Sequence, residues 1–290
     1  MSLGRLYELA YARWQRPEYG RVAARSSRRN LQALLYGAAS VPEGAMVPEE
    51  SRLLRASGFA MLRAPGAAAA MRFGMHGGGH GHPDKLNLVT WGGGRMWGLD
   101  PGSINYGVPL HKEWYRSTIA HNTVTVDGAL QAEKDGQAGE WKTGGGATTF
   151  TASAASAYPG VTLTRTVTVR GNRIEDRFEC ASGAEHTYDW AFHAPGRLTT
   201  SLALKPGPER IAATAGYQHV EGVASGRAAG GWWARWEAEG ERFTLRVKAA
   251  EQTEVFTGAA PGKNPADRVP VLIVRRRGRN ATFDVLHEFT

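Results

Sequence analysis

The chain has 290 residues, of which 42% are hydrophobic and 21% charged, an ordinary balance for a globular protein with a real core. Its formal net charge of +8 attracts polyanions, but the basic residues accompany no nucleic-acid-binding motif, and no apolar stretch is long enough to span a bilayer. We therefore expect neither nucleic acid nor a membrane as partner, and the single cysteine, Cys180, excludes an intrachain disulfide framework.

The first forty residues have the pattern of helices. Apolar residues recur at helical spacing in two segments, Leu6, Tyr7, Ala10, Tyr11 and Trp14, and then Leu31, Leu34 and Leu35. Pro42 and Gly44 end this region, and residues 47–51 have the composition of a linker. Two short amphipathic helices bury little apolar surface against each other. Residues 1–45 are therefore predicted to end a larger helical domain or to cap the domain that follows.

From Gly58 onward the hydrophobic period changes to two. Val161, Leu163, Val167 and Val169 alternate with threonines, as in a half-buried strand, and Gly171-Asn172 then predicts a hairpin turn. The other predicted strands are 58–63, 84–91, 95–99, 122–127, 147–153, 173–179, 186–192, 231–238, 242–248, 270–276 and 281–286. Strands at this density, without helices between them, predict a mainly β fold, an antiparallel β-sandwich over residues 46–290 preceded by the short helical segment.

Three features between Gly74 and Gly128 carry chemical information. His80-Gly81-His82 follows three glycines, and residues two apart in an extended segment face the same side, so both imidazoles could enter one cleft. Asp100 ends a strand before Pro101-Gly102, and His121 precedes a strand of high β propensity. Each feature alone also fits a structural role, as a solvated glycine loop, a turn or a hydrogen-bonded histidine. Together, two histidines and one carboxylate suit zinc.

The order of these segments resembles the heparinase II/III-like polysaccharide lyases of bacteria. The chain matches their GHGHPD segment from His80 to Asp84, their DPG turn from Asp100 to Gly102, and their RST-x-x-HN segment from Arg116 to Asn122. The resemblance implies a toroid of helices followed by antiparallel β-sandwich domains, so residues 1–45 would end the toroid. It also implies that His82, Asp100 and His121 hold a metal, and that His80 is the catalytic histidine on the sandwich side.

These lyases cleave uronic-acid polysaccharides by β-elimination, so the resemblance implies alginate, heparin or a related acidic chain as substrate. The reaction must neutralise the uronate carboxylate, remove the proton at C5 and protonate the departing oxygen. Tyr106, Tyr115 and Arg116 lie between the metal motifs and are candidates for substrate binding, with core packing as the alternative for the tyrosines. We expect the zinc to be structural, with a catalytic metal as the alternative.

Three functions remain open on the sequence. The first is a lyase, or its C-terminal half, in which the principal base and the tyrosine acid come from a helical toroid domain or a partner chain. The second is a noncatalytic β-sandwich that binds acidic carbohydrate and contains a structural zinc ion. The third is a zinc hydrolase, which the absence of a HExxH helix disfavours. The location, bacterial periplasm or cytoplasm, stays open.

Overall fold

The computed structural model describes residues 3–25, 31–42 and 50–290. The chain divides into two compact units, residues 1–49 and residues 50–290, and each is described here by itself. The boundary expected at residues 45 and 46, and most of the expected linker, fall within residues 43–49 and so lie outside the described residues.

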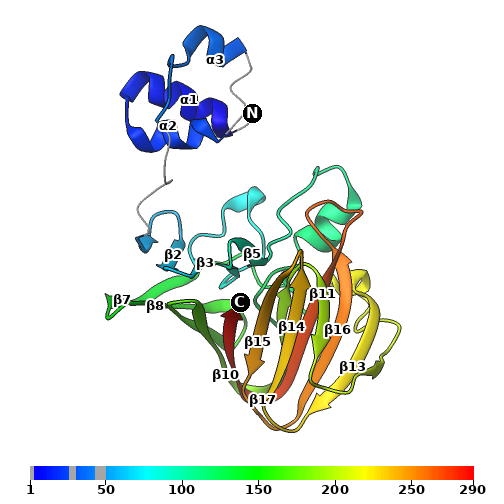
Figure 1. Ribbon diagram of the computed structural model, residues 1–290. Coiled ribbons are helices and arrows are strands. Elements are labelled where there is room, and N and C mark those ends of the chain that lie inside the picture. The colour runs from blue at the N-terminus through cyan, green and yellow to red at the C-terminus, as the bar shows by residue number, and fades with distance from the viewer. Residues whose placement is uncertain (1–2, 26–30, 43–49) are drawn as a thin grey trace. The chain divides into compact units, whose positions relative to one another are not determined.

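The first unit is helical in its described part. Its helices are α1 (Leu3–Trp14), α2 (Pro17–Ala24) and α3 (Leu31–Tyr36) (Figure 1). Proline stands at the first position of α2, where its missing N–H costs no hydrogen bond. Gly20 of α2 lies so close to Pro42 that a Cβ there would clash with the proline ring. None of the described helices is long and apolar enough to cross a membrane.

The second unit begins with a small antiparallel sheet of five strands in chain order. Its strands are β1 (Arg52–Leu54), β2 (Phe59–Ala64), β3 (Ala67–Arg72), β4 (Leu88–Gly92) and β5 (Arg95–Gly98). The long loop between β3 and β4 carries His80 and His82, and the loop after β5 carries Asp100. This sheet therefore presents two of the three candidate metal ligands from neighbouring loops.

A second sheet contains the other twelve strands of the described chain. They are β6 (Val124–Val126), β7 (Gln137–Gly144), β8 (Ala147–Tyr158), β9 (Val161–Arg170), β10 (Arg173–His193), β11 (Arg197–Thr200), β12 (Lys205–Pro206), β13 (Glu221–Ala228), β14 (Trp232–Ala238), β15 (Glu241–Val247), β16 (Thr253–Pro261) and β17 (Arg268–Phe289). The two long strands β10 and β17 pair antiparallel along nearly their whole length and form the middle of the sheet. β6 pairs with β10 and places His121, just before it, beside that middle.

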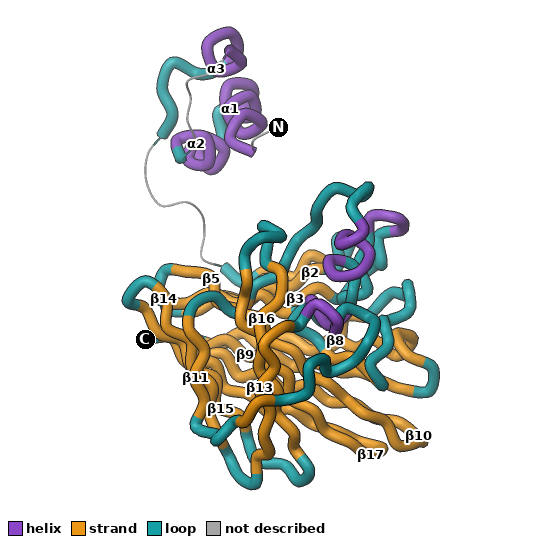
Figure 2. Tube along the Cα trace, turned by 90° about the vertical axis from the view of Figure 1, so that its right-hand side faces the viewer, coloured by secondary structure: helices purple, strands orange, loops and turns teal. Residues whose placement is uncertain are grey.

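The hydrophobic core fills the space between the two sheets. Alternate side chains of β2 and β3, such as Leu62 and Met71, belong to the same buried cluster as Val167 of β9 and Trp190 of β10. A second buried cluster lies on the other face of β10 and is formed in part by Trp114 and neighbours from the loop before β6. Figures 1 and 2 show this loop, with its short helical turns, beyond the ends of the strands. The chain is thus mainly β, an antiparallel sandwich preceded by a short helical segment, as predicted.

A fully buried ion pair ties the sandwich to the loops. Arg165 on β9 donates two hydrogen bonds to the Asp176 carboxylate on β10, at 2.8 and 2.6 Å. Its remaining nitrogen donates to the carbonyl oxygens of Leu86 and Asn122, both at 2.6 Å. Burial opposes the charge on Asp176, but the guanidinium outweighs it and lowers the pKa of the carboxyl. Through these two carbonyls, Arg165 holds the loop that carries His82 and the loop that carries His121 against the sandwich.

Replacing Asp176 with asparagine should leave the buried Arg165 charge without its carboxylate. Such a change costs about 3–5 kcal/mol of folding free energy. Urea unfolding of Asp176→Asn should therefore show a much lower midpoint than the wild-type chain. Asp284→Asn is the matched control, because Asp284 is partly exposed and its surface ion pair with Arg177 contributes only about 0–1 kcal/mol. Equal midpoints for the two variants would contradict the role given to the buried pair.

Candidate functional site

A pocket of about 330 Å³ opens between the small sheet and the loops that carry the motif residues. Its lining consists of apolar side chains from β2, β3 and β4, Arg72 at the end of β3, and residues from two loops, one between β3 and β4 and one after β5: Phe59, Ala70, Arg72, His80, His82, Asp84, Asn87, Val89, Asp100, Gly102 and Ser103. The structure therefore gathers both histidines of the GHGHPD segment and the aspartate of the DPG turn around one cavity. We call it the histidine pocket.

His80 stands at the exposed rim of the histidine pocket. It ends a short 3-10 turn, Gly78–His80, and its Nδ1 lies 2.8 Å from the Tyr106 hydroxyl oxygen, at hydrogen-bond distance. Tyr106 is itself 57% exposed, and the edge of the His111 ring packs against it with the ring centroids 4.5 Å apart. Two loops that are separate in sequence thus hold an imidazole and a phenol together at the surface.

Deeper in the site, His82, Asp100 and His121 converge. Nδ1 of His121 lies 2.9 Å from the nearer Asp100 oxygen, and the His82 and His121 rings have centroids 5.4 Å apart. Burial, with the adjacent His121 charge, lowers the pKa of His82 to about 4. Burial also opposes protonation of His121, but the Asp100 carboxylate outweighs it and raises the pKa of that imidazole. Burial thus favours the neutral form of His82, which a metal ligand requires, whereas Asp100 favours the protonated form of His121.

Two asparagines hold these ligand candidates in place. Asn87 donates from its amide to Asp100 at 2.6 Å and accepts from the backbone N–H of Asn122 at 2.9 Å. The Asn122 amide donates to the carbonyls of Leu88 and Leu99, both at 2.9 Å. Its oxygen accepts from the backbone N–H of His193 at 2.8 Å. A single buried side chain therefore joins the loops before β4, after β5 and before β6.

The three residues have the donor types that zinc prefers. Two imidazoles and one carboxylate are a zinc donor set, but in this structure His121 and Asp100 are joined by a hydrogen bond of 2.9 Å. Within the described ranges, however, no three His, Cys, Asp or Glu side chains already have the spacing of a metal site. Zinc therefore stays a prediction.

The other predicted site residues lie away from the histidine pocket. Tyr115 is completely buried, and its hydroxyl donates to the Gly262 carbonyl at 2.7 Å, so its surface is not open to a substrate. It has the packing role that was the alternative. Arg116 is partly exposed and pairs with Glu133 at 2.9 Å, outside the residues that line the pocket. Of the three predicted substrate-binding residues, Tyr106 alone contacts His80.

Several residues of the site carried no signal in the sequence. His111 belongs to no motif, yet its ring packs against Tyr106 and lies 6.3 Å from the His82 ring, measured between centroids. Asn87 lies within the segment predicted as the strand 84–91, and Arg72 follows Met71 after a run of four alanines. Their roles depend on which loops meet in space, and a single sequence does not give this information.

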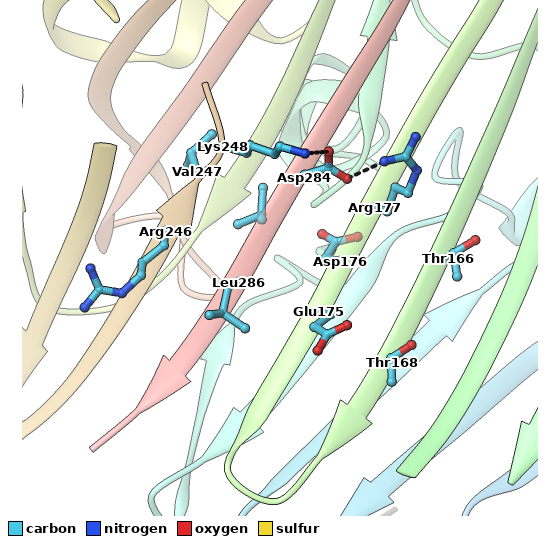
Figure 3. Close-up of a pocket in the computed structure, with 11 residues that line it drawn as sticks. Thr166, Thr168, Glu175, Asp176, Arg177, Arg246, Val247, Lys248, Asp284 and Leu286 are labelled. Carbon is cyan, nitrogen blue, oxygen red and sulfur yellow. Dashed lines mark hydrogen bonds and ion pairs between the residues drawn. The ribbon is translucent and has the colours of Figure 1, made fainter. Parts of the chain in front are cut away.

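A larger hollow of about 520 Å³ lies on the outer face of the large sheet, over β9, β10, β15 and β17 (Figure 3). Several of its charged side chains form ion pairs. Asp284 contacts Arg177 at 2.9 Å and Lys248 at 3.9 Å, and Arg246 pairs with Glu288 beside it. Cross-strand ion pairs of this kind are typical of a solvated sheet face. The histidines of the GHGHPD segment line the histidine pocket instead, and none of the described residues that line the outer hollow is a histidine.

Comparison with known proteins agrees with this geometry. The family described as "Heparinase II/III-like, C-terminal" matches residues 46–281, which include the histidine pocket and both sheets. The chain belongs to this family. Membership of this family is consistent with the antiparallel β-sandwich.

Relatives of this heparinase II/III-like chain are longer than it is. An alginate lyase of Stenotrophomonas maltophilia strain K279a is 28% identical over 269 residues, which cover 78% of this chain and 35% of that protein. The structure of a heparan sulfate lyase, HepC, from Pedobacter heparinus superimposes with a TM-score of 0.71 at 14% identity. That superposition covers 100% of this chain and 42% of HepC. The chain thus spans about two fifths or less of these relatives.

Asn122→Asp should disrupt the scaffold without changing the size of the side chain. An aspartate oxygen would replace the amide that donates to Leu88 and Leu99, so two carbonyls would lose their donor and face a negative charge. We expect a loss of about 3 kcal/mol of folding free energy, measured by urea unfolding. Asn105→Asp is the matched control, because exposed Asn105 uses only its oxygen, which accepts from Gly107 N–H and which aspartate retains. A stability of Asn122→Asp equal to that of the control would refute the scaffold role.

Proposed function

We propose that this chain forms the sandwich side of the active site of a lyase that cleaves uronic-acid polysaccharide by β-elimination. The observation that carries the proposal is the exposed His80 imidazole, held by Tyr106 at the rim of the histidine pocket. Membership of a family of polysaccharide lyases supports the reaction class. The names of two relatives, an alginate lyase and a heparan sulfate lyase, support an acidic polysaccharide as substrate.

His80 would neutralise the uronate carboxylate. When the Tyr106 hydroxyl donates to Nδ1, the ring proton resides on Nε2, and this N–H is then available to donate to a carboxylate. A hydrogen bond to the carboxylate stabilises the negative charge that spreads onto it when the C5 proton leaves. His80 would therefore act most strongly at the transition state, which is the condition for raising kcat.

Tyr106 would fix the direction of His80 and contact the sugar with its exposed ring. Aromatic rings present an apolar face to a sugar while the hydroxyl keeps a polar partner. The principal base and the acid of the elimination would come from helical residues outside the sandwich, in a toroid domain or a partner chain. The net charge of +8 would favour association with a polyanionic chain.

Zinc held by His82, Asp100 and His121 would be structural in this proposal. When bound, the ion would supply a fixed positive centre that holds the loops of the histidine pocket together. The Asn87 amide, which donates to Asp100 at 2.6 Å, would orient the carboxylate ligand. His80 belongs to the same loop as His82. Fixing His82 on the ion would therefore also restrict the movement of the exposed His80 imidazole.

The proposal is tested by incubating the protein, together with the toroid domain or partner chain that supplies the base and acid, with alginate and heparan sulfate oligosaccharides. Elimination creates an unsaturated uronate whose ultraviolet absorbance rises with time, and His80→Ala should lower kcat/KM by about 100-fold or more. His186→Ala serves as the control, since His186 pairs with Asp127 outside the pocket and its loss should leave the rate unchanged. New reducing ends without the absorbance would indicate a hydrolase. Saccharide binding without product, unaffected by His80→Ala, would indicate a binding module.

The metal is tested separately by thermal unfolding. Zinc at 100 times its dissociation constant stabilises a binding protein by about 2.7 kcal/mol, so the wild-type Tm should rise by about 5 °C or more. His82→Ala and His121→Ala should abolish this rise. His111→Ala should retain it, because His111 belongs to the same group of rings but lies outside the predicted ligand set. Purified protein that takes up no zinc and shows no rise in Tm would rule out the metal proposal.

A further inference from the structure

The loop that carries His80 narrows to a neck at its base. On one side of the neck the His76 carbonyl oxygen approaches Gly81 so closely that a Cβ at position 81 would lie 1.9 Å from it. Gly77 and Gly78, beyond the neck, have φ values of 92° and 61°, a region that L side chains rarely adopt. Residues 77–80 therefore form an arc that projects from the closed neck, with His80 at its end.

Arg72, the last residue of β3, binds both sides of this neck. Its Nη2 donates to the carbonyl oxygens of Met75 and His76, at 3.3 and 2.8 Å. Its Nε lies 3.0 Å from the carboxylate of Asp84, which follows His82-Pro83 on the returning side. One planar guanidinium thus contacts the chain before the arc and the chain after it.

The backbone reinforces the same position. Arg72 N–H donates to the Asn87 carbonyl, and the Arg72 carbonyl accepts from Leu86 N–H, at 3.0 and 2.8 Å. The loop therefore starts and ends beside one residue. Asp135 adds a contact from another loop, because its carboxylate accepts from the backbone N–H of His76 at 2.8 Å. The base of the loop is consequently rigid although its tip is exposed.

We propose that Arg72 is a positioning residue, whose guanidinium closes the neck at His76 and Gly81 and so fixes where His80 stands relative to Tyr106 and the histidine pocket. The inference rests on the proposed function for its catalytic consequence, but the closure of the neck is a property of the loop itself. Lysine would keep the charge of Arg72 but not the planar fork that reaches two carbonyls and a carboxylate together. A positive charge at position 72 is therefore not enough to hold the neck closed, because the planar guanidinium is also needed.

Hydrogen exchange of the peptide covering residues 74–84 tests the neck without any substrate. Arg72→Gln and Arg72→Lys should each speed exchange in this peptide at least fivefold, and Gly81→Ala should do the same by forcing His76 and residue 81 apart. Gly79→Ala is the matched control in the same loop, because a Cβ there meets no atom within 4 Å. Arg177→Gln, which removes an exposed guanidinium paired with Asp284, controls for loss of charge. Both controls should exchange like the wild type.

Lyase kinetics give the second measurement. If the elimination activity is present, Arg72→Gln and Gly81→Ala should lower kcat by about tenfold with little change in KM, while Gly79→Ala stays within twofold of the wild type. If the wild-type protein makes no unsaturated product when it is assayed together with the toroid domain or partner chain that supplies the base and acid, the proposed function fails. The exchange data then test the role of Arg72 by themselves. Unchanged exchange in residues 74–84 of Arg72→Gln would overturn the inference whatever the activity.

Discussion

The candidate site depends on one buried charge pair. Arg165 has no exposed surface, so its guanidinium must satisfy every donor inside the protein. The Asp176 carboxylate accepts two hydrogen bonds from it, and the carbonyls of Leu86 and Asn122 accept two more. Because those carbonyls belong to the loops beside His82 and His121, the requirement to satisfy a buried cation also sets the distance between the loops. The chemistry at the surface is thus supported by an interaction deep in the sandwich.

The fold was predictable where burial alternates along a strand. β9, with its valines and threonines, and the first part of β10 follow the period of two that the sequence shows. β3 was missed, since its alanines have low β propensity and form a strand only because β2 and β4 pair with both of its edges. β7 was missed as well: it is glycine-rich and largely exposed, so its sequence lacks the alternation of a half-buried strand.

The motif residues of the site could be predicted from the sequence, but the residues that hold them in place could not. The resemblance to the lyase family implied that His82, Asp100 and His121 belong together. The structure brings them close to one another, while their binding of zinc remains a prediction. The direction of a side chain is a different matter. Tyr115 and Tyr106 looked equivalent in sequence, but a π-helical turn directs Tyr115 into the second buried cluster, whereas Tyr106 stays on an exposed loop. Such differences arise from long-range packing, which local patterns do not encode.

The pairing of β10 with β17 has a consequence for how the chain folds. These strands join residues about a hundred positions apart, from Arg173 with Glu288 to His193 with Val271, and both halves of the large sheet are built on them. Loop-closure entropy must therefore be overcome before either half gains its interior contacts, which slows folding in proteins of high contact order. We expect the nascent chain to expose unpaired strand edges until its C-terminal strand has been synthesised, so that assembly of the sheet is a late, cooperative step.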